Sequence, residues 1–195
     1  MGYPTEPIGL EPYDHVMEKV LQEAKVDQDQ VEKLMTLVGV HESGGDPSIH
    51  QYGGGPGRGL YQYELQKSTE HPKASGAGRT AMNRLYAALG GDLIEGKKPA
   101  NMPKWMNKYF SINQWGHHEA SGDVDFSELT EEQQKILFLA DKLMTEGAIK
   151  DIGVLADHEW WAKYHHKGAD SDVQKFSDDA ARHLKGEFRK LLNIE

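Results

Sequence analysis

The spacing of hydrophobic positions along the chain is typical of α-helices. After Asp27, apolar residues recur every three or four positions, which places them on one helix face; they are Val31, Leu34, Met35 and Val38. Asp27 is a suitable N-cap, and the pair Gly44-Gly45 supplies the left-handed backbone that ends helices. The pattern predicts a helix that ends beside His41 and Glu42.

The same spacing recurs in other parts of the chain. It predicts further helices at about residues 11–25, 79–89, 131–145, 157–166 and 172–192. Thr130 and Gln133 form a capping box at the start of the clearest of them. Alternation of polar and β-branched residues is hard to find, so the expected fold class is mainly α.

Two intervening segments have a different composition. Residues 44–59 are rich in glycine and include two prolines, which is typical of a loop. A long loop directly after a buried helix is often functional. Residues 97–125 are irregular and rich in aromatic side chains. No repeat or linker divides the chain, so we expect one domain, with residues 1–26 as an N-terminal helical arm and residues 27–195 as its main body.

Composition excludes several classes of protein. The formal net charge is −9 without a basic block, which argues against nucleic-acid binding. The absence of cysteine excludes disulfide frameworks and thiol catalysis. The N-terminus lacks a basic start and an apolar run, and no segment approaches the roughly 20 apolar residues that span a bilayer. We therefore expect synthesis in a cytoplasm, no signal peptide and no membrane insertion.

Three short segments carry the candidate chemistry. They are residues 41–45 (HESGG), 57–62 (GRGLYQ) and 164–168 (YHHKG). In this order they resemble the signature of lytic transglycosylases, which have a Glu-Ser pair at a helix end, a later Gly-Leu-x-Gln segment and a late Tyr-Asn-x-Gly-like segment. The resemblance implies a lysozyme-like, goose-type-like helical catalytic domain over residues 27–195, with a glycine-rich active-site loop.

The resemblance also implies an activity and a set of site residues. The expected reaction is cleavage of the MurNAc-GlcNAc β-1,4 bond of bacterial peptidoglycan. In the family one glutamate protonates the glycosidic oxygen and then takes the proton of the sugar's own 6-hydroxyl, which gives 1,6-anhydro-MurNAc ends without a cofactor. Glu42 matches that acid/base. The expected substrate-binding residues are Ser43, Gly59, Leu60, Tyr61, Gln62, Tyr164 and His165.

The residue chemistry of Glu42 agrees with this assignment. A carboxyl group that donates a proton near neutral pH needs a raised pKa, and burial at a helix end beside apolar walls raises it. Taken without its neighbours, Glu42 is better explained as a solvated residue at a helix terminus, since most glutamates lie at the surface. The accompanying motifs favour catalysis.

The other candidate residues each have two interpretations. Asp46 and Glu64 are possible second carboxylates of a hydrolytic muramidase, or a turn former before Pro47 and a surface residue. Trp115 is able to stack on a sugar ring or to make a core contact. Gly59 permits close approach of a sugar to the backbone, and the Gln62 amide offers a donor and an acceptor.

The chain departs from the family pattern at two positions. Tyr61 replaces a common Met, which keeps the bulk and adds a hydroxyl. His165 stands where the pattern carries Asn. Tyr164 is expected either to point its hydroxyl at Glu42 or the sugar, or to belong to the core.

Two other functions remain open at this point. Ten histidines permit a zinc-dependent amidase or endopeptidase that cuts the peptide stem, although the helical His-Glu-x-x-His spacing is absent and we expect no metal. A non-catalytic wall-binding structural module would keep the fold alone. We expect a monomer, encoded by a bacteriophage, that acts on the periplasmic cell wall as an endolysin or a virion component.

Overall fold

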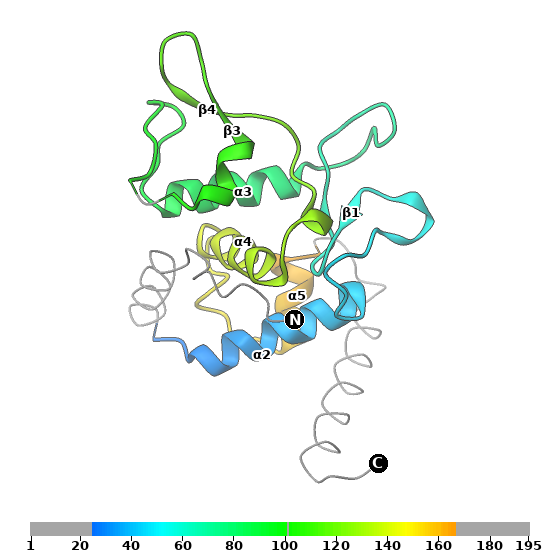
Figure 1. Cartoon of the computed structure of the whole chain (residues 1–195). Helices are drawn as coiled ribbons and strands as arrows, with labels where there is room; N and C mark the ends of the chain where they lie inside the picture. Colours follow the sequence, from blue (N-terminus) through cyan, green and yellow to red (C-terminus); the bar gives the residue numbers. More distant parts are fainter. Residues whose placement is uncertain (1–24, 101, 167–195) are drawn as a thin grey trace, which may run out of the picture.

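The computed structural model describes residues 25–100 and 102–166, in which helices predominate over two small sheets (Figure 1). The helices are α2 (Gln28–Ser43), α3 (Ala77–Ala88), α4 (Glu131–Leu143) and α5 (Asp157–Tyr164). Three short 3-10 helices join them: η1 (Tyr52–Gly54), η2 (Lys104–Tyr109) and η3 (Phe126–Glu128). A largely helical fold is confirmed at this coarse level. The expected helices at about 11–25 and 172–192 lie almost entirely outside the described residues.

Helix α2 begins and ends where its sequence predicts. The carboxylate of Asp27 accepts a hydrogen bond from the backbone N–H of Asp29 at 2.9 Å. At the other end Gly44 has a φ of 67° and Gly45 a φ of 84°. Their N–H groups donate to the carbonyls of Val40 and Gly39, which satisfies the last turn of the helix. This ending fixes the place of Glu42.

Helix α4 is the central element, since α3 packs along one side of it and α2 lies on the other (Figure 1). The capping box is confirmed: Thr130 Oγ1 accepts from the N–H of Gln133 at 3.2 Å, and Gln133 Oε1 accepts from the N–H of Thr130 at 3.1 Å. The core is formed by side chains of all four helices and of the intervening loops, with Leu37, Met82, Leu137 and Trp160 fully buried.

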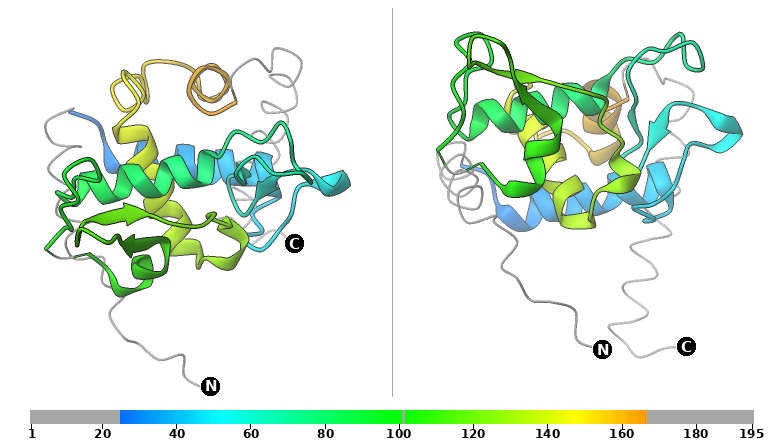
Figure 2. Two further views of the ribbon diagram at one scale, coloured as in Figure 1. Left: turned by 90° about the horizontal axis from the view of Figure 1, so that it is seen from above. Right: turned by 45° about the horizontal axis from the view of Figure 1, so that its top comes forward.

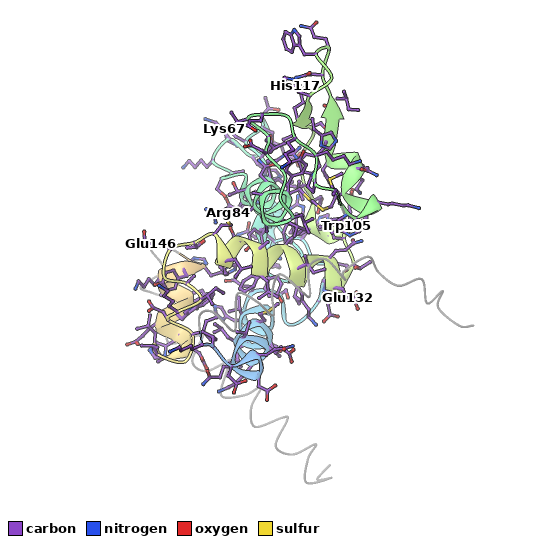
Figure 3. All side chains as sticks on the ribbon, turned by 90° about the vertical axis from the view of Figure 1, so that its left-hand side faces the viewer. Lys67, Arg84, Trp105, His117, Glu132 and Glu146 are labelled. Carbon is purple, nitrogen blue, oxygen red and sulfur yellow. The ribbon has the colours of Figure 1, made fainter. Side chains whose placement is uncertain are left out.

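Both sheets are antiparallel pairs. Strand β1 (Gly57–Arg58) pairs with β2 (Tyr63–Glu64), and β3 (Phe110–Ile112) pairs with β4 (His118–Ala120). The sequence pattern did not predict these strands, because alternation over two or three residues cannot be recognised. The β3–β4 hairpin, which carries His117, extends from the body on the side away from α5 (Figure 3).

One buried amide anchors the glycine-rich loop to α4. Gln134 is fully buried, and its Oε1 accepts from the N–H of Leu60 at 2.7 Å. Its Nε2 donates to the carbonyl of Pro47 at 2.8 Å and to that of Leu129 at 3.0 Å. The loop leading into β1 projects from the body in both views of Figure 2, yet its two ends are held by a single side chain.

None of the helices in the described residues has the length and apolar character that crossing a bilayer requires.

Candidate active site

Glu42 lies in the last turn of α2 with its side chain only 12% exposed. The indole N–H of Trp161 on α5 donates to Glu42 Oε1 at 2.7 Å. Nε2 of His165 and Nδ1 of His166 each lie 3.8 Å from the same oxygen. The carboxyl group is therefore enclosed by one indole and two imidazoles from the end of α5.

The pKa of Glu42 differs in direction from the sequence expectation. Burial raises it, as expected, but a hydrogen bond from His166 lowers it. His165 in its protonated form, the indole N–H of Trp161 and the charge of His166 lower it further. The net pKa lies below the ordinary value for Glu, because the expectation considered the apolar walls and left out the donors.

Trp161 is the residue nearest to this chemistry that sequence reasoning missed. Its side chain is fully buried, stacks on the His166 ring at 4.9 Å and meets the His41 ring edge-on at 4.7 Å. The sequence contained a signal, because a buried tryptophan needs a partner for its indole N–H. Trp161 also precedes Tyr164 by one helical turn, which places both on one face of α5.

A cleft of about 660 Å³ opens beside Glu42. Its walls bring together all three sequence motifs, since Glu42, Gln62 and Tyr164 all line it. Tyr61, Glu64 and His165 line it as well. Its volume is within the range of roughly 300–1,000 Å³ that is usual for ligand pockets.

The Gly-Leu-x-Gln segment forms the tight turn between β1 and β2. Gly59 has a φ of 72° and is buried, and a Cβ built on it would lie 2.4 Å from Gln134 Oε1. Leu60 is in the core against Gly39, and Tyr61 stacks on Phe138 at 4.2 Å. The structure thus gives Gly59 and Leu60 packing roles, and neither lines the cleft.

Gln62 closes this turn and is the amide that the cleft presents. Its backbone adopts a φ of 52°, unusual for a residue with a side chain. Its Nε2 donates to the carbonyl of Gly59 at 2.9 Å, which fixes the amide orientation. The remaining polar positions of the amide are able to meet a ligand.

The late motif supplies two residues with different contacts from those expected. The hydroxyl of Tyr164 donates to Asp151 instead of pointing at Glu42. His165 Nε2 lies 3.0 Å from the carbonyl oxygen of Tyr61, to which it donates. Burial and the nearby charge of Lys142 lower the pKa of His165 to about 4, so this imidazole is neutral at physiological pH.

Three more of the expected site residues lie outside the cleft, and a fourth, Glu64, lines it. Ser43 is buried, donates to the carbonyl of Gly39 at 2.7 Å and accepts from the N–H of Gly45. Asp46 is exposed and accepts from the N–H and hydroxyl of Ser48, as expected of a turn former. Trp115 is 72% exposed on the turn between β3 and β4, outside the cleft. Glu64 lines the cleft and accepts from the N–H of Ser75 at 2.8 Å.

The cleft also contains a charged group that the sequence pattern did not indicate. Asp141 and Lys142 on α4 are buried, and Arg84 on α3 binds Asp141 Oδ1 at 2.5 Å. Lys142 Nζ donates to the carbonyl of Tyr164 at 2.9 Å and lies 3.0 Å from Asp141 Oδ2. Charged residues within an apolar helical stripe were the available signal.

Tyr52 is a second cleft-lining residue that the pattern missed. It is fully exposed, at the start of η1 in the glycine-rich loop. A large exposed aromatic side chain at the rim of a cleft is suited to cover the face of a ligand.

Comparisons of the chain with protein-family models, with curated proteins and with solved structures found no match. In the described part of the chain, no group of three or more histidine or acidic side chains is arranged to hold a metal ion.

Proposed function

We propose that this protein cleaves the MurNAc-GlcNAc β-1,4 bond of bacterial peptidoglycan, with Glu42 as its acid/base. The observation that carries the proposal is the meeting of Glu42, Gln62 and Tyr164 at one cleft. These residues come from three segments that are far apart in the sequence, and each belongs to a motif that resembles the lytic transglycosylases. A lysozyme-like arrangement of the helices is part of the same proposal.

The surroundings of Glu42 suit a carboxyl group that changes protonation state during a reaction. His166 and Trp161 stabilise the carboxylate form of Glu42, whereas burial favours the neutral acid. Among the side chains that surround Glu42, His166 is the exposed one, with 46% of its side chain accessible. A sugar that enters the cleft and displaces His166 removes a group that lowers the pKa of Glu42. Burial, which raises this pKa, then has the larger effect, and the carboxyl group becomes a proton donor.

A single-carboxylate reaction agrees with the other acidic groups near the cleft. Both oxygens of Asp141 are engaged, by Tyr63, Arg84 and Lys142. Asp46 does not line the cleft. Glu64 is the remaining candidate for a second carboxylate, so the choice between a lytic transglycosylase and a muramidase depends on it.

Glu42→Gln tests the proposal directly. Gln keeps an oxygen that accepts from Trp161 but cannot donate the catalytic proton, so wall clearing should fall by about 10²-fold or more. Glu32→Gln, an exposed change on the same helix, is the matched control and should clear walls at the original rate. Circular dichroism should show both variants folded. Unchanged clearing by Glu42→Gln would exclude the proposal.

The released products distinguish the two reaction types. Mass spectrometry of muropeptides released by the unaltered protein should show 1,6-anhydro ends, which lack one water relative to hydrolysis products. Hydrolysis products that disappear in Glu64→Gln would instead assign Glu64 as the second carboxylate of a muramidase.

A further inference from the structure

Arg84 lines the cleft, and the hydrogen bonds of its guanidinium group come from one nitrogen. Its Nη1 makes three hydrogen bonds, to the carbonyl of Asp141 at 3.1 Å, to Asp141 Oδ1 at 2.5 Å and to Thr145 Oγ1 at 3.0 Å. Nε and Nη2 make no hydrogen bond within the described residues, and 33% of the side chain is exposed. The Nε–Nη2 edge has the planar fork that binds a carboxylate through two parallel hydrogen bonds.

Two cations and one carboxylate form a network on this wall of the cleft. Asp141 Oδ2 accepts from the hydroxyl of Tyr63 at 2.7 Å and lies 3.0 Å from Lys142 Nζ. Its other oxygen is paired with Arg84. One buried carboxylate thus faces two cations, Arg84 and Lys142, and this network also holds the Arg84 side chain in position.

Arg84 and Glu42 border the same cleft from different sides. Arg84 projects from α3, and Glu42 ends α2, on the opposite side of α4 (Figures 1 and 3). A ligand that reaches both residues must therefore extend beyond the bond that is cleaved at Glu42. The opposite charge is also available to such a ligand, because Glu64 lines the cleft from β2.

We propose that the Arg84 end of the cleft binds a carboxylate of the peptide that branches from the glycan strand. This inference rests on the proposed function. In a peptide-bearing strand the lactyl carboxyl of MurNAc is an amide and the sugars are uncharged, whereas the peptide branch carries carboxylates and, where it contains a diamino acid, an ammonium group. Arg84 and Glu64 match those two charges. The substrate is then the peptide-bearing strand, in preference to the bare glycan.

The experiment compares two substrates and two ligands. The substrates are peptidoglycan strands with their peptides and the same strands after an amidase has removed the peptides and the freed lactyl carboxylates have been converted to amides. The ligands are a peptide-bearing disaccharide and its peptide-free counterpart with an amidated lactyl group, titrated calorimetrically into the Glu42→Gln protein. We expect peptide-bearing material to bind about 10-fold more tightly and to be cleaved with a kcat/KM higher by a similar factor.

Arg84→Lys is the decisive variant. Lysine keeps a positive charge that is able to pair with Asp141 but lacks the planar fork. It should lose the preference for peptide-bearing material while cleavage of bare strands changes little. Arg79→Gln is the matched control, since Arg79 lies on the same helix and donates to the carbonyls of Tyr109 and Gly122 outside the cleft. It should keep the preference.

The outcomes separate this inference from the proposed function. Two results overturn the inference and leave the proposed glycosidase activity standing. One is equal binding and cleavage of peptide-bearing and peptide-free substrates by the unaltered protein. The other is an equal loss of activity on both substrates in Arg84→Lys. Failure to cleave or bind either material overturns both. A preference that is lost in Arg84→Lys and kept in Arg79→Gln supports the inference.

Discussion

Glu42 is surrounded by groups that move its pKa in opposite directions. Burial favours the neutral acid, and the donors from α5 favour the carboxylate. His166 contributes both a hydrogen bond and a charge, and it is the most exposed of these donors. The protonation of Glu42 therefore depends on a side chain that a ligand is able to move.

Replacement of His166 by Ala should shift the pH dependence of activity. Because His166 lowers the pKa of Glu42, its removal raises that pKa, and the acid form then persists to higher pH. The alkaline limb of the profile of kcat/KM against pH should move upward. His117→Ala, which removes an exposed histidine on the hairpin, is the control and should leave the limb in place. An unchanged or lowered limb in His166→Ala would contradict this account of the site.

For single residues, the sequence predicted the position in a helix better than the side-chain contacts. The glycine pair fixed the end of α2, so Glu42 could be placed from local rules. Its partner Trp161 is 119 residues away, and no local pattern encodes such a contact. For the same reason the hydroxyl of Tyr164 was expected near Glu42, whereas tertiary packing brings it to Asp151.

Among the elements, the β1–β2 turn packs closely against α4 and η3. Gly59 combines a positive φ with contact against α4 and η3, since a Cβ there would lie 2.4 Å from Gln134 Oε1 and 2.9 Å from Phe126 Cβ. The turn is held by the pairing of β1 with β2 and by its contacts with α4 and η3. Gln62 therefore reaches the cleft from a rigid support.

Gly59→Ala should be markedly destabilising. Its Cβ adds overpacking to the backbone strain of a positive φ, which together cost about 3 kcal/mol of unfolding free energy. Gly116→Ala is a matched control, because Gly116 has a φ of 80° but no atom within 4 Å of a built Cβ. It should lose only about 1 kcal/mol. Urea unfolding measures both, and equal losses would show that packing against Gln134 is unimportant.

The elements also show where sequence patterns stop being informative. The helices α2, α3 and α4 were predicted because their apolar stripes run over several turns. The four strands are two or three residues long, and their pairing depends on turns. Such short pairs carry no period, so the two sheets were missed.

For the whole molecule, the buried histidine makes stability depend on pH. Burial first, and then Lys142, lower the pKa of His165 to about 4, whereas an unfolded histidine titrates near 6.5. Between these pH values His165 binds a proton in the unfolded chain but not in the folded chain. The free energy of unfolding should therefore fall as the pH decreases from about 6.5 towards 4.

Urea unfolding at neutral pH and at about pH 5 tests this linkage. The folded protein should lose on the order of 2 kcal/mol, since one histidine contributes at most about 1.4 kcal/mol per pH unit. His118, whose pKa burial also lowers, acts in the same direction. The loss should therefore become smaller, without vanishing, in His165→Gln. Equal stability at both pH values would contradict the buried, neutral state of His165.

The side chain of Gln134 acts as a cross-link between α4 and the glycine-rich loop. A cysteine-free chain obtains this tie from two hydrogen bonds of one amide, to the N–H of Leu60 and the carbonyl of Pro47. Thiols do not cleave such a tie and oxidants do not form it. The loop beside the cleft accordingly keeps one geometry in reducing and in oxidising surroundings.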